Sequence, residues 1–162
     1  MNKVWTRVKI YHDGDEFFAD YLFAIKQAKE SVTIESYIFE SDSIADRILR
    51  ELAAAVQRGC SVRLLVDGVG SYFWTKILTA RCARDQIPFR VYHPIPGILQ
   101  WIPRLISVLS VGAPRLFTRT NRRNHRKTLI VDGKIAFLGS FNVTRVHLQS
   151  VMAPNAWRDS GV

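Results

Sequence analysis

In the last third of the sequence a histidine and a lysine are separated by a single residue. An aspartate and a Gly-Ser-Phe-Asn run follow at short intervals. An imidazole can act as a nucleophile or base, and an ammonium group supplies a fixed positive charge. A hydroxyl and an amide add neutral hydrogen bonds. Together these groups suit a tetrahedral phosphate whose negative charge grows in the transition state. The candidate residues are His125, Lys127, Asp132, Gly139, Ser140 and Asn142.

Two short β-rich runs, Thr128 to Val131 and Ile135 to Leu138, are expected to form a hairpin that holds these residues together. The Asp132-Gly133 pair between them is a strong signal for the turn. Side chains alternate along a strand, so the histidine and lysine are expected on one face, with the serine and asparagine returning beside them. Gly139, which follows the second β-rich run, is expected to leave room for a substrate to approach the backbone. An isolated His-x-Lys pair would more often be two solvated strand residues.

The run from His125 to Asn142 is similar, without a gap, to the H-x-K-x(4)-D-x(6)-G-S-x-N signature of the phospholipase D superfamily. The sequence from Val8 to Ser71 resembles the N-terminal half of bacterial cardiolipin synthases, and so does the run RTNRRNHRK that ends at Lys127. The similarity is weakest between Pro94 and Pro114. It implies an α/β fold, a phospholipase D-like layered sheet flanked by helices, as one half of a two-domain or dimeric arrangement.

The resemblance also implies a role for each residue of the motif, with no metal or other cofactor. His125 is the nucleophile, or the acid/base partner, of a two-step transfer through a phosphohistidine. Lys127 and Asn142 hold the phosphate oxygens with support from Ser140. Asp132 is grouped with the catalytic residues but braces the motif without touching phosphorus. Asp159 falls where the family has a carboxylate that orients the histidine ring, although an ordinary surface aspartate is the alternative reading.

The family pairs two copies of the motif, whereas this sequence has one within a single expected domain, residues 1–162. His12, His93 and His147 lack the surrounding lysine and Gly-Ser-x-Asn context. Two chains could pair, or this could be the first half of a longer chain. The closing strand and helix of complete family domains are absent after Val162, which favours the second arrangement. The chain alone is then expected to have little or no activity.

The expected activity is phosphatidyl transfer between phosphatidylglycerol molecules, as in cardiolipin synthases. An apolar-aromatic stretch around Trp101, Ile102 and Leu105, and a basic run from Arg115 to Lys127, favour an anionic phospholipid and a membrane surface as partners, although core packing is an equal reading of the apolar stretch. A metal-independent, homodimeric nuclease is the alternative enzyme, with nucleic acid the less favoured partner. An inactive basic membrane- or nucleic-acid-binding remnant is the third reading.

Composition narrows the partner and the location. The formal net charge of +9 favours an anionic partner. Cys60 and Cys82 are expected to be buried thiols, and the N-terminus lacks an apolar core of signal-peptide length. The apolar stretch from Ile95 to Ala113 is interrupted by charge and proline, which makes it a poor membrane span. The expected location is peripheral, on the cytoplasmic side of the bacterial inner membrane.

Upstream of the motif, alternating strand and helix patterns predict the layered sheet. The run VRLLV is nearly continuous and apolar, which predicts a strand covered on both faces. The glycine-rich run from Asp67 to Ser71 is expected to be a tight strand-to-helix turn rather than a phosphate cradle. Residues 94–124 are expected to be a proline-rich insertion that is first apolar and then basic. The predicted strands are Val8–Tyr11, Val32–Phe39, Val62–Val66 and Phe89–Tyr92, and the predicted helices are Glu16–Glu30, a second from Ser43 as N-cap to Gly59, Lys76–Arg84 and a short Arg104–Val111.

Overall fold

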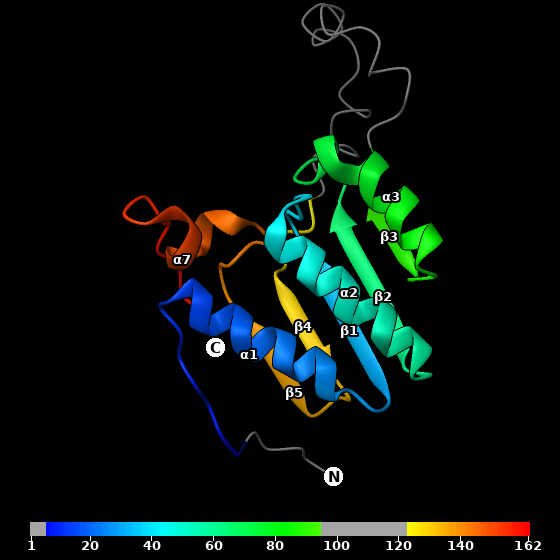
Figure 1. The fold of residues 1–162 in the computed structure, drawn as a ribbon, viewed down its shortest axis with the longest axis horizontal. Helices are drawn as coiled ribbons and strands as arrows, with labels where there is room; N and C mark the ends of the chain where they lie inside the picture. Colours follow the sequence, from blue (N-terminus) through cyan, green and yellow to red (C-terminus); the bar gives the residue numbers. More distant parts are fainter. Residues whose placement is uncertain (1–5, 95–122) are drawn as a thin grey trace, which may run out of the picture.

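A five-stranded mixed sheet, in the order β3-β2-β1-β4-β5, forms the centre of the molecule (Figure 1). The computed structural model describes residues 6–94 and 123–162. The first three strands run parallel, and the last two join them in antiparallel pairing. The strands are β1 Ser31–Ser36, β2 Ser61–Asp67, β3 Phe89–Tyr92, β4 Thr128–Val131 and β5 Ile135–Leu138. This arrangement confirms the predicted α/β sheet flanked by helices.

The helices begin where short polar side chains cap their first turn. The carboxylate of Asp13 accepts the N–H of Glu16, and that of Asp42 accepts the N–H groups of Ile44 and Ala45. The cap of the second helix is therefore one residue earlier than the predicted Ser43. The helical segments are α1 Gly14–Gln27, α2 Ser43–Gln57, the 3₁₀ turn η1 Tyr72–Trp74, α3 Thr75–Arg84, the 3₁₀ turn η2 Arg145–His147 and α7 Gln149–Met152.

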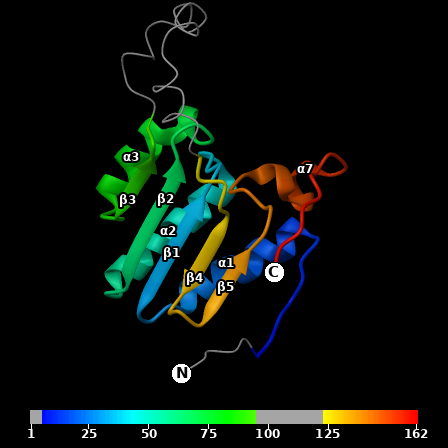
Figure 2. The same cartoon turned by 180° about the vertical axis from the view of Figure 1, so that it is seen from behind.

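Helices α1 and α2 cover one face of the sheet, and in the described residues the opposite face is open (Figures 1 and 2). The expectation that β2 is covered on both faces is therefore wrong for this part of the chain. Residues alternate along β2, with Val62 and Leu64 buried and Arg63 exposed between them. The covered face carries the core, which includes Val32, Ile34, Val66, Ile25, Ile48, Leu52 and Leu129.

The hairpin of β4 and β5 forms as predicted, with its turn at Asp132-Gly133. Both residues have positive φ, 52° and 59°, as a tight hairpin turn requires. The carboxylate of Asp132 also accepts the backbone N–H groups of Lys29, Glu30 and Ser31 at 3.0, 2.8 and 2.7 Å. One side chain thus joins the hairpin turn to the corner between α1 and β1.

Several other predictions can be compared with the described residues. The glycine-rich run after β2 is a tight turn, as predicted, because the buried carboxylate of Asp67 accepts the N–H groups of Val69 and Gly70. Cys60 and Cys82 are free and buried, also as predicted. The predicted strand at residues 8–11 is wrong, since only Tyr11 pairs, in an isolated bridge to Gly161.

The remaining differences are at element ends or fall outside the described residues. The predicted strand 32–39 stops at residue 36, and the predicted helix 16–30 runs instead over residues 14–27. The predicted helix 104–111, the apolar stretch 95–113 and most of the basic run lie outside the described residues. Among the described helices, none combines the length and apolar character needed to cross a bilayer.

Candidate active site

The ring of His125 lies flat on the ring of Tyr37, with 4.0 Å between centroids and 19° between planes. Tyr37 directly follows β1, and His125 lies just before β4, so both are at the same end of two paired strands. His125 is exposed, and its ring nitrogens make no hydrogen bond within the described parts of the chain. Stacking fixes the plane of the imidazole while leaving its nitrogens accessible to a reactant.

Lys127 reaches the same place. Its Nζ atom lies 5.4 Å from the centroid of the Tyr37 ring and donates to the carbonyl oxygen of His125 at 3.1 Å. The ammonium group keeps further N–H bonds for an anion, because an ammonium has three donors. The contact with the aromatic face stabilises the cation beside the imidazole.

Asn142 joins the group through the residue after Tyr37. Its Oδ1 atom accepts the backbone N–H of Ile38 at 3.3 Å, which leaves the side-chain Nδ2 group available as a donor. The imidazole, the ammonium group and the amide therefore meet around the pair Tyr37-Ile38, which we call the β1 exit. Residues 125–127 precede β4 and residues 139–142 follow β5, so these groups come from the strand ends rather than from the strands.

The backbone of Asn142 is held by a histidine that lies outside the sequence motif. Its N–H donates to Nε2 of His147 at 3.3 Å, and the ring of His147 is 1% exposed. On the other side of the ring, Nδ1 lies 3.2 Å from Oδ2 of Asp159, close enough for an ion pair but without hydrogen-bond alignment. Burial lowers the pKa of His147 below its usual value, although Asp159 acts in the opposite direction. The buried ring is therefore neutral near pH 7.

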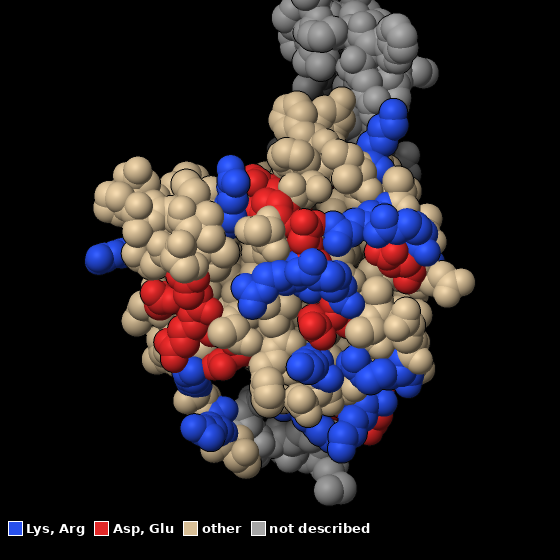
Figure 3. Space-filling model, viewed as in Figure 1, with Lys and Arg blue, Asp and Glu red and all other residues tan. Residues whose placement is uncertain are grey.

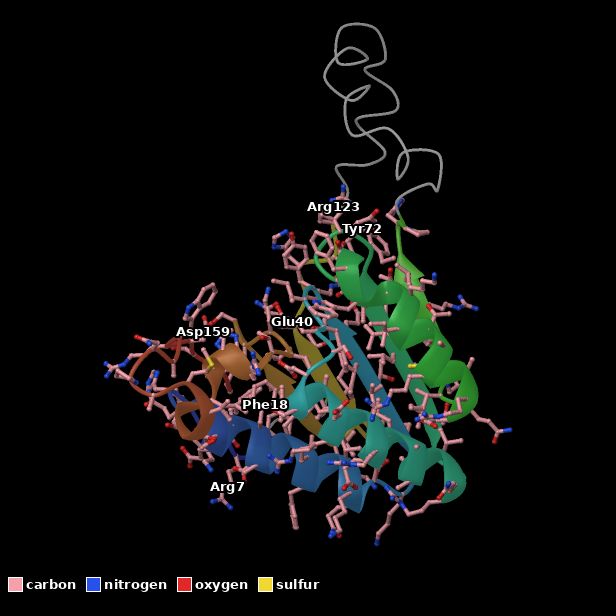
Figure 4. All side chains as sticks on the ribbon, turned by 45° about the horizontal axis from the view of Figure 1, so that its top comes forward. Arg7, Phe18, Glu40, Tyr72, Arg123 and Asp159 are labelled. Carbon is pink, nitrogen blue, oxygen red and sulfur yellow. The ribbon has the colours of Figure 1, made fainter. Side chains whose placement is uncertain are left out.

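Asp159 therefore contacts a different ring from the one expected. The family resemblance implies that this carboxylate orients His125, whereas in the structure its Oδ2 atom lies 3.2 Å from Nδ1 of His147. Figure 4 shows Asp159 on the side of the molecule that carries α7, away from the end that carries Tyr72 and Arg123. Asp159 reaches the β1 exit indirectly, through His147 and the backbone of Asn142.

Ser140 and Gly139 are engaged with the C-terminal segment. The hydroxyl of Ser140 donates to the carbonyl of Ser160 at 3.2 Å and accepts the Ser160 N–H at 3.1 Å. A Cβ atom on Gly139 would lie 2.4 Å from the Ser160 carbonyl oxygen. The expectation that Gly139 leaves space for a substrate is therefore wrong, because Ser160 and Gly161 occupy that space. Beside them is an open pocket of about 380 Å³, lined by His12, Ser140, Arg158, Asp159 and Ser160.

Asp132 lies at the opposite end of the hairpin from the β1 exit. It follows the last residue of β4, whereas His125 and Lys127 precede the first, and a strand rises about 3.3 Å per residue. Asp132 is thus separated from the other residues grouped as catalytic, and its hydrogen bonds are those of a residue that braces the hairpin, a role that stays a prediction. Hydrogen bonds from the N–H groups of Ser31 and Lys29 lower the pKa of this carboxyl.

Further polar residues position the segment that carries His125. Asn124 donates from its backbone N–H to Asp67 and from its side chain to Glu35, each at 2.9 Å. Glu35 also lies 3.4 Å from Nη1 of Arg126. Of the residues that sequence reasoning missed, Glu35 gave one usable signal, since it is a charged residue at alternate spacing in an apolar strand. No group of three or more His, Cys, Asp or Glu side chains suited to a metal occurs in the described residues.

Comparison with known proteins identifies the family. Residues 21–152 match the family described as "Cardiolipin synthase, PLD-like domain". The chain therefore belongs to the phospholipase D-like family and is cardiolipin synthase-like. It is 32% identical over 162 residues to a cardiolipin synthase of Clostridium perfringens strain SM101, a match that covers 98% of this chain and 30% of that protein. It is 29% identical over 157 residues to cardiolipin synthase B of Salmonella typhimurium, covering 97% and 34%.

Solved structures show the same fold. Nuc, a phospholipase D family member from Salmonella typhimurium, has a TM-score of 0.64 at 22% identity, covering 96% of this chain and 80% of Nuc. Phosphatidylserine synthase of Haemophilus influenzae has a TM-score of 0.64 at 14% identity, covering 95% and 32%. At these identities the likeness concerns the fold alone. The chain spans about 30% of the length of the cardiolipin synthases it matches first.

Proposed function

We propose that this chain supplies one half-site of a phosphatidyltransferase that makes cardiolipin from two phosphatidylglycerol molecules. The observation that supports the proposal is the meeting of three groups at the β1 exit: the exposed ring of His125, the ammonium group of Lys127 and the amide of Asn142. Together they offer a nucleophile, a cation and a neutral donor to one phosphoryl group.

In the first step, a ring nitrogen of His125 forms a bond to the phosphorus of phosphatidylglycerol, and the bond from phosphorus to the glycerol oxygen breaks. Glycerol leaves after its oxygen receives a proton from an acid. In the second step, a hydroxyl of another phosphatidylglycerol attacks phosphorus and gives its proton to the conjugate base of that acid. The phosphohistidine bond breaks, and cardiolipin and the free imidazole result. Lys127 and the Asn142 Nδ2 group stabilise the negative charge that develops on the oxygens in both steps.

The acid for the first step must come from a second half-site. His147 is buried between Asn142 and Asp159, and the ring that contacts His125 in the described residues belongs to Tyr37. A second His-x-Lys motif, in a longer chain or in a second copy of this one, is the partner we propose. The lipid substrate also implies a peripheral site of action, at the cytoplasmic surface of the bacterial inner membrane.

The test measures cardiolipin and glycerol released from phosphatidylglycerol vesicles by the chain alone and by the chain joined to a C-terminal half with its own motif. We expect turnover only with the second half present. His125→Ala should abolish turnover while leaving the unfolding midpoint within experimental error, because the side chain is exposed. Robust turnover by the wild-type chain as a monomer would contradict the half-site role, whereas turnover by a dimer would assign the second half-site to another copy of this chain. Retention of activity in His125→Ala would contradict the nucleophile.

A parallel incubation with plasmid DNA separates the lipid reaction from a nuclease reaction. Nicked plasmid without cardiolipin would replace the proposal with phosphodiester hydrolysis of nucleic acid. Cardiolipin without nicking supports the proposal.

A further inference from the structure

The turn η1 exposes large aromatic side chains next to the candidate active site. Phe73 is 83% exposed, and Tyr72 and Trp74 on either side are partly exposed. Ile77, one helical turn later in α3, is 50% exposed. Aromatic and aliphatic side chains exposed together on a soluble domain commonly mark a surface that binds a partner or a membrane.

This turn is fixed to the β1 exit. Ser71, which is fully buried, accepts the N–H of Phe39 at 3.0 Å and donates to the carbonyl of Tyr37 at 3.1 Å. Gly70 packs so closely on Tyr37 that a Cβ atom would lie 2.3 Å from the Tyr37 carbonyl oxygen. The exposed aromatic residues and the ring beneath His125 therefore belong to one rigid unit. A surface contact made by η1 would set the distance of the imidazole from that surface.

The same end of the molecule carries positive charge. Lys76 is exposed at the start of α3, and Figure 4 shows Tyr72 and Arg123 at this end. Arg126 is 72% exposed beside Glu35, whose carboxylate is already hydrogen-bonded to Asn124. In Figure 3 the tip of the molecule over η1 is covered mainly by uncharged atoms, with a basic side chain nearby. Apolar atoms flanked by cations fit the interface of an anionic bilayer, where aromatic rings enter the headgroup region and cations meet the phosphates.

We propose that η1, with Phe73 at its tip, inserts into the interface of an anionic phospholipid bilayer and holds the β1 exit against the headgroups. This inference rests on the proposed function, because that function places the substrate phosphate in a bilayer. It assigns the contact to residues 72–74, with Ile77 and Lys76 at its margin.

The test is flotation of the full chain with phosphatidylglycerol vesicles and with neutral phosphatidylcholine vesicles. Phe73→Ala should weaken binding to the anionic vesicles roughly tenfold, the loss expected when a Phe side chain no longer leaves water. Phe23→Ala is the matched control, since Phe23 is 63% exposed on α1 and lies outside the proposed surface. Binding of Phe23→Ala should equal that of the wild type. The proposal would be overturned if Phe73→Ala bound the anionic vesicles as well as the wild type, or if Phe23→Ala lost as much binding as Phe73→Ala.

A fluorescent reporter tests insertion directly. Phe73→Cys and Phe23→Cys are each labelled with an environment-sensitive dye, while Cys60 and Cys82 remain protected because both are buried. The label at position 73 should shift to shorter wavelength on phosphatidylglycerol vesicles, and the label at position 23 should not. No shift at position 73 would overturn the proposal. A shift with single-stranded oligonucleotide but not with vesicles would overturn it in favour of base stacking.

The two proposals fail separately. Vesicle binding by His125→Ala measures docking without chemistry. If the reconstituted wild type docks normally but forms no cardiolipin, the proposed docking role of η1 stands and the proposed transferase function fails. If reconstituted Phe73→Ala binds vesicles normally and forms cardiolipin at the wild-type rate, the docking role of η1 fails and the transferase function stands.

Discussion

The backbone N–H of Asn142 donates a hydrogen bond to Nε2 of His147, so a fully buried imidazole positions one of the residues that face the proposed phosphate. The acceptor role of Nε2 requires the proton on Nδ1, which faces Asp159. We therefore propose that His147 and Asp159 act on the candidate site through Asn142. They are positioning residues, and neither reaches the β1 exit itself.

Replacing His147 by leucine should leave the Asn142 N–H without an acceptor and lower the free energy of unfolding by about 1–3 kcal/mol. Turnover of the reconstituted enzyme should fall mainly through kcat, because the amide of Asn142 is then misplaced in the transition state. Urea unfolding and steady-state kinetics measure the two effects. His147→Gln keeps an acceptor near the same place and should restore part of both. Equal loss in the glutamine and leucine variants would contradict the role of the acceptor.

The same ring predicts how stability depends on pH. Burial holds the pKa of His147 below its unfolded value of about 6.5, so the unfolded chain binds the extra proton first as the pH falls. The contribution of the neutral ring to stability is thus complete above about pH 6.5 and is lost as the pH falls below it. Urea unfolding at a series of pH values between 7.5 and 5 measures the slope. The free energy of unfolding of His147→Gln should depend less on pH over that range. The same pH dependence in this variant and in the wild type would show that His147 is not its source.

Gly139→Ala should displace the C-terminal segment, because the new Cβ atom would meet the Ser160 carbonyl oxygen and because φ is +154°. We expect a loss of at least about 1–3 kcal/mol, in the range for strain and lost packing, and faster tryptic cleavage after Arg158. Gly59→Ala is the control, since Gly59 also has positive φ, +84°, but has nothing within 4 Å of the new atom. A larger loss in Gly139→Ala than in Gly59→Ala is expected from the clash with Ser160. Equal losses in the two variants would contradict a clash with Ser160 at Gly139.

Asp132→Ala removes the acceptor of three backbone N–H groups at the corner between α1 and β1. The free energy of unfolding should fall by about 1–3 kcal/mol, since the site is only partly buried and water can replace some of the bonds. Turnover per folded molecule should be unchanged, because Asp132 is at the far end of the hairpin from the β1 exit. Thermal unfolding and active-fraction titration separate these effects. A large drop in turnover at full folding would restore Asp132 to the catalytic group.

The local parts of the fold could be predicted from the sequence. The hairpin follows from two β-rich runs and an Asp-Gly turn, and the strand-helix alternation gives the sheet. The pairing of Ser140 with Ser160 and of His147 with Asn142 could not be predicted, because spacing alone does not report which segments meet in space. Gly139 illustrates the limit, since the sequence shows a residue without a side chain but not the carbonyl oxygen that fills the vacant space.

The sheet order has a consequence for synthesis of the protein. β1 lies between β2, which follows it closely in the chain, and β4, which is made only after residue 127. At about 5–20 residues per second, the ribosome needs roughly 5–20 s to pass from the end of β1 to the end of β4. During that interval one edge of β1 is open to any other strand, including the same strand of a neighbouring nascent chain. We expect this interval, rather than the finished domain, to be when the protein is most prone to aggregate.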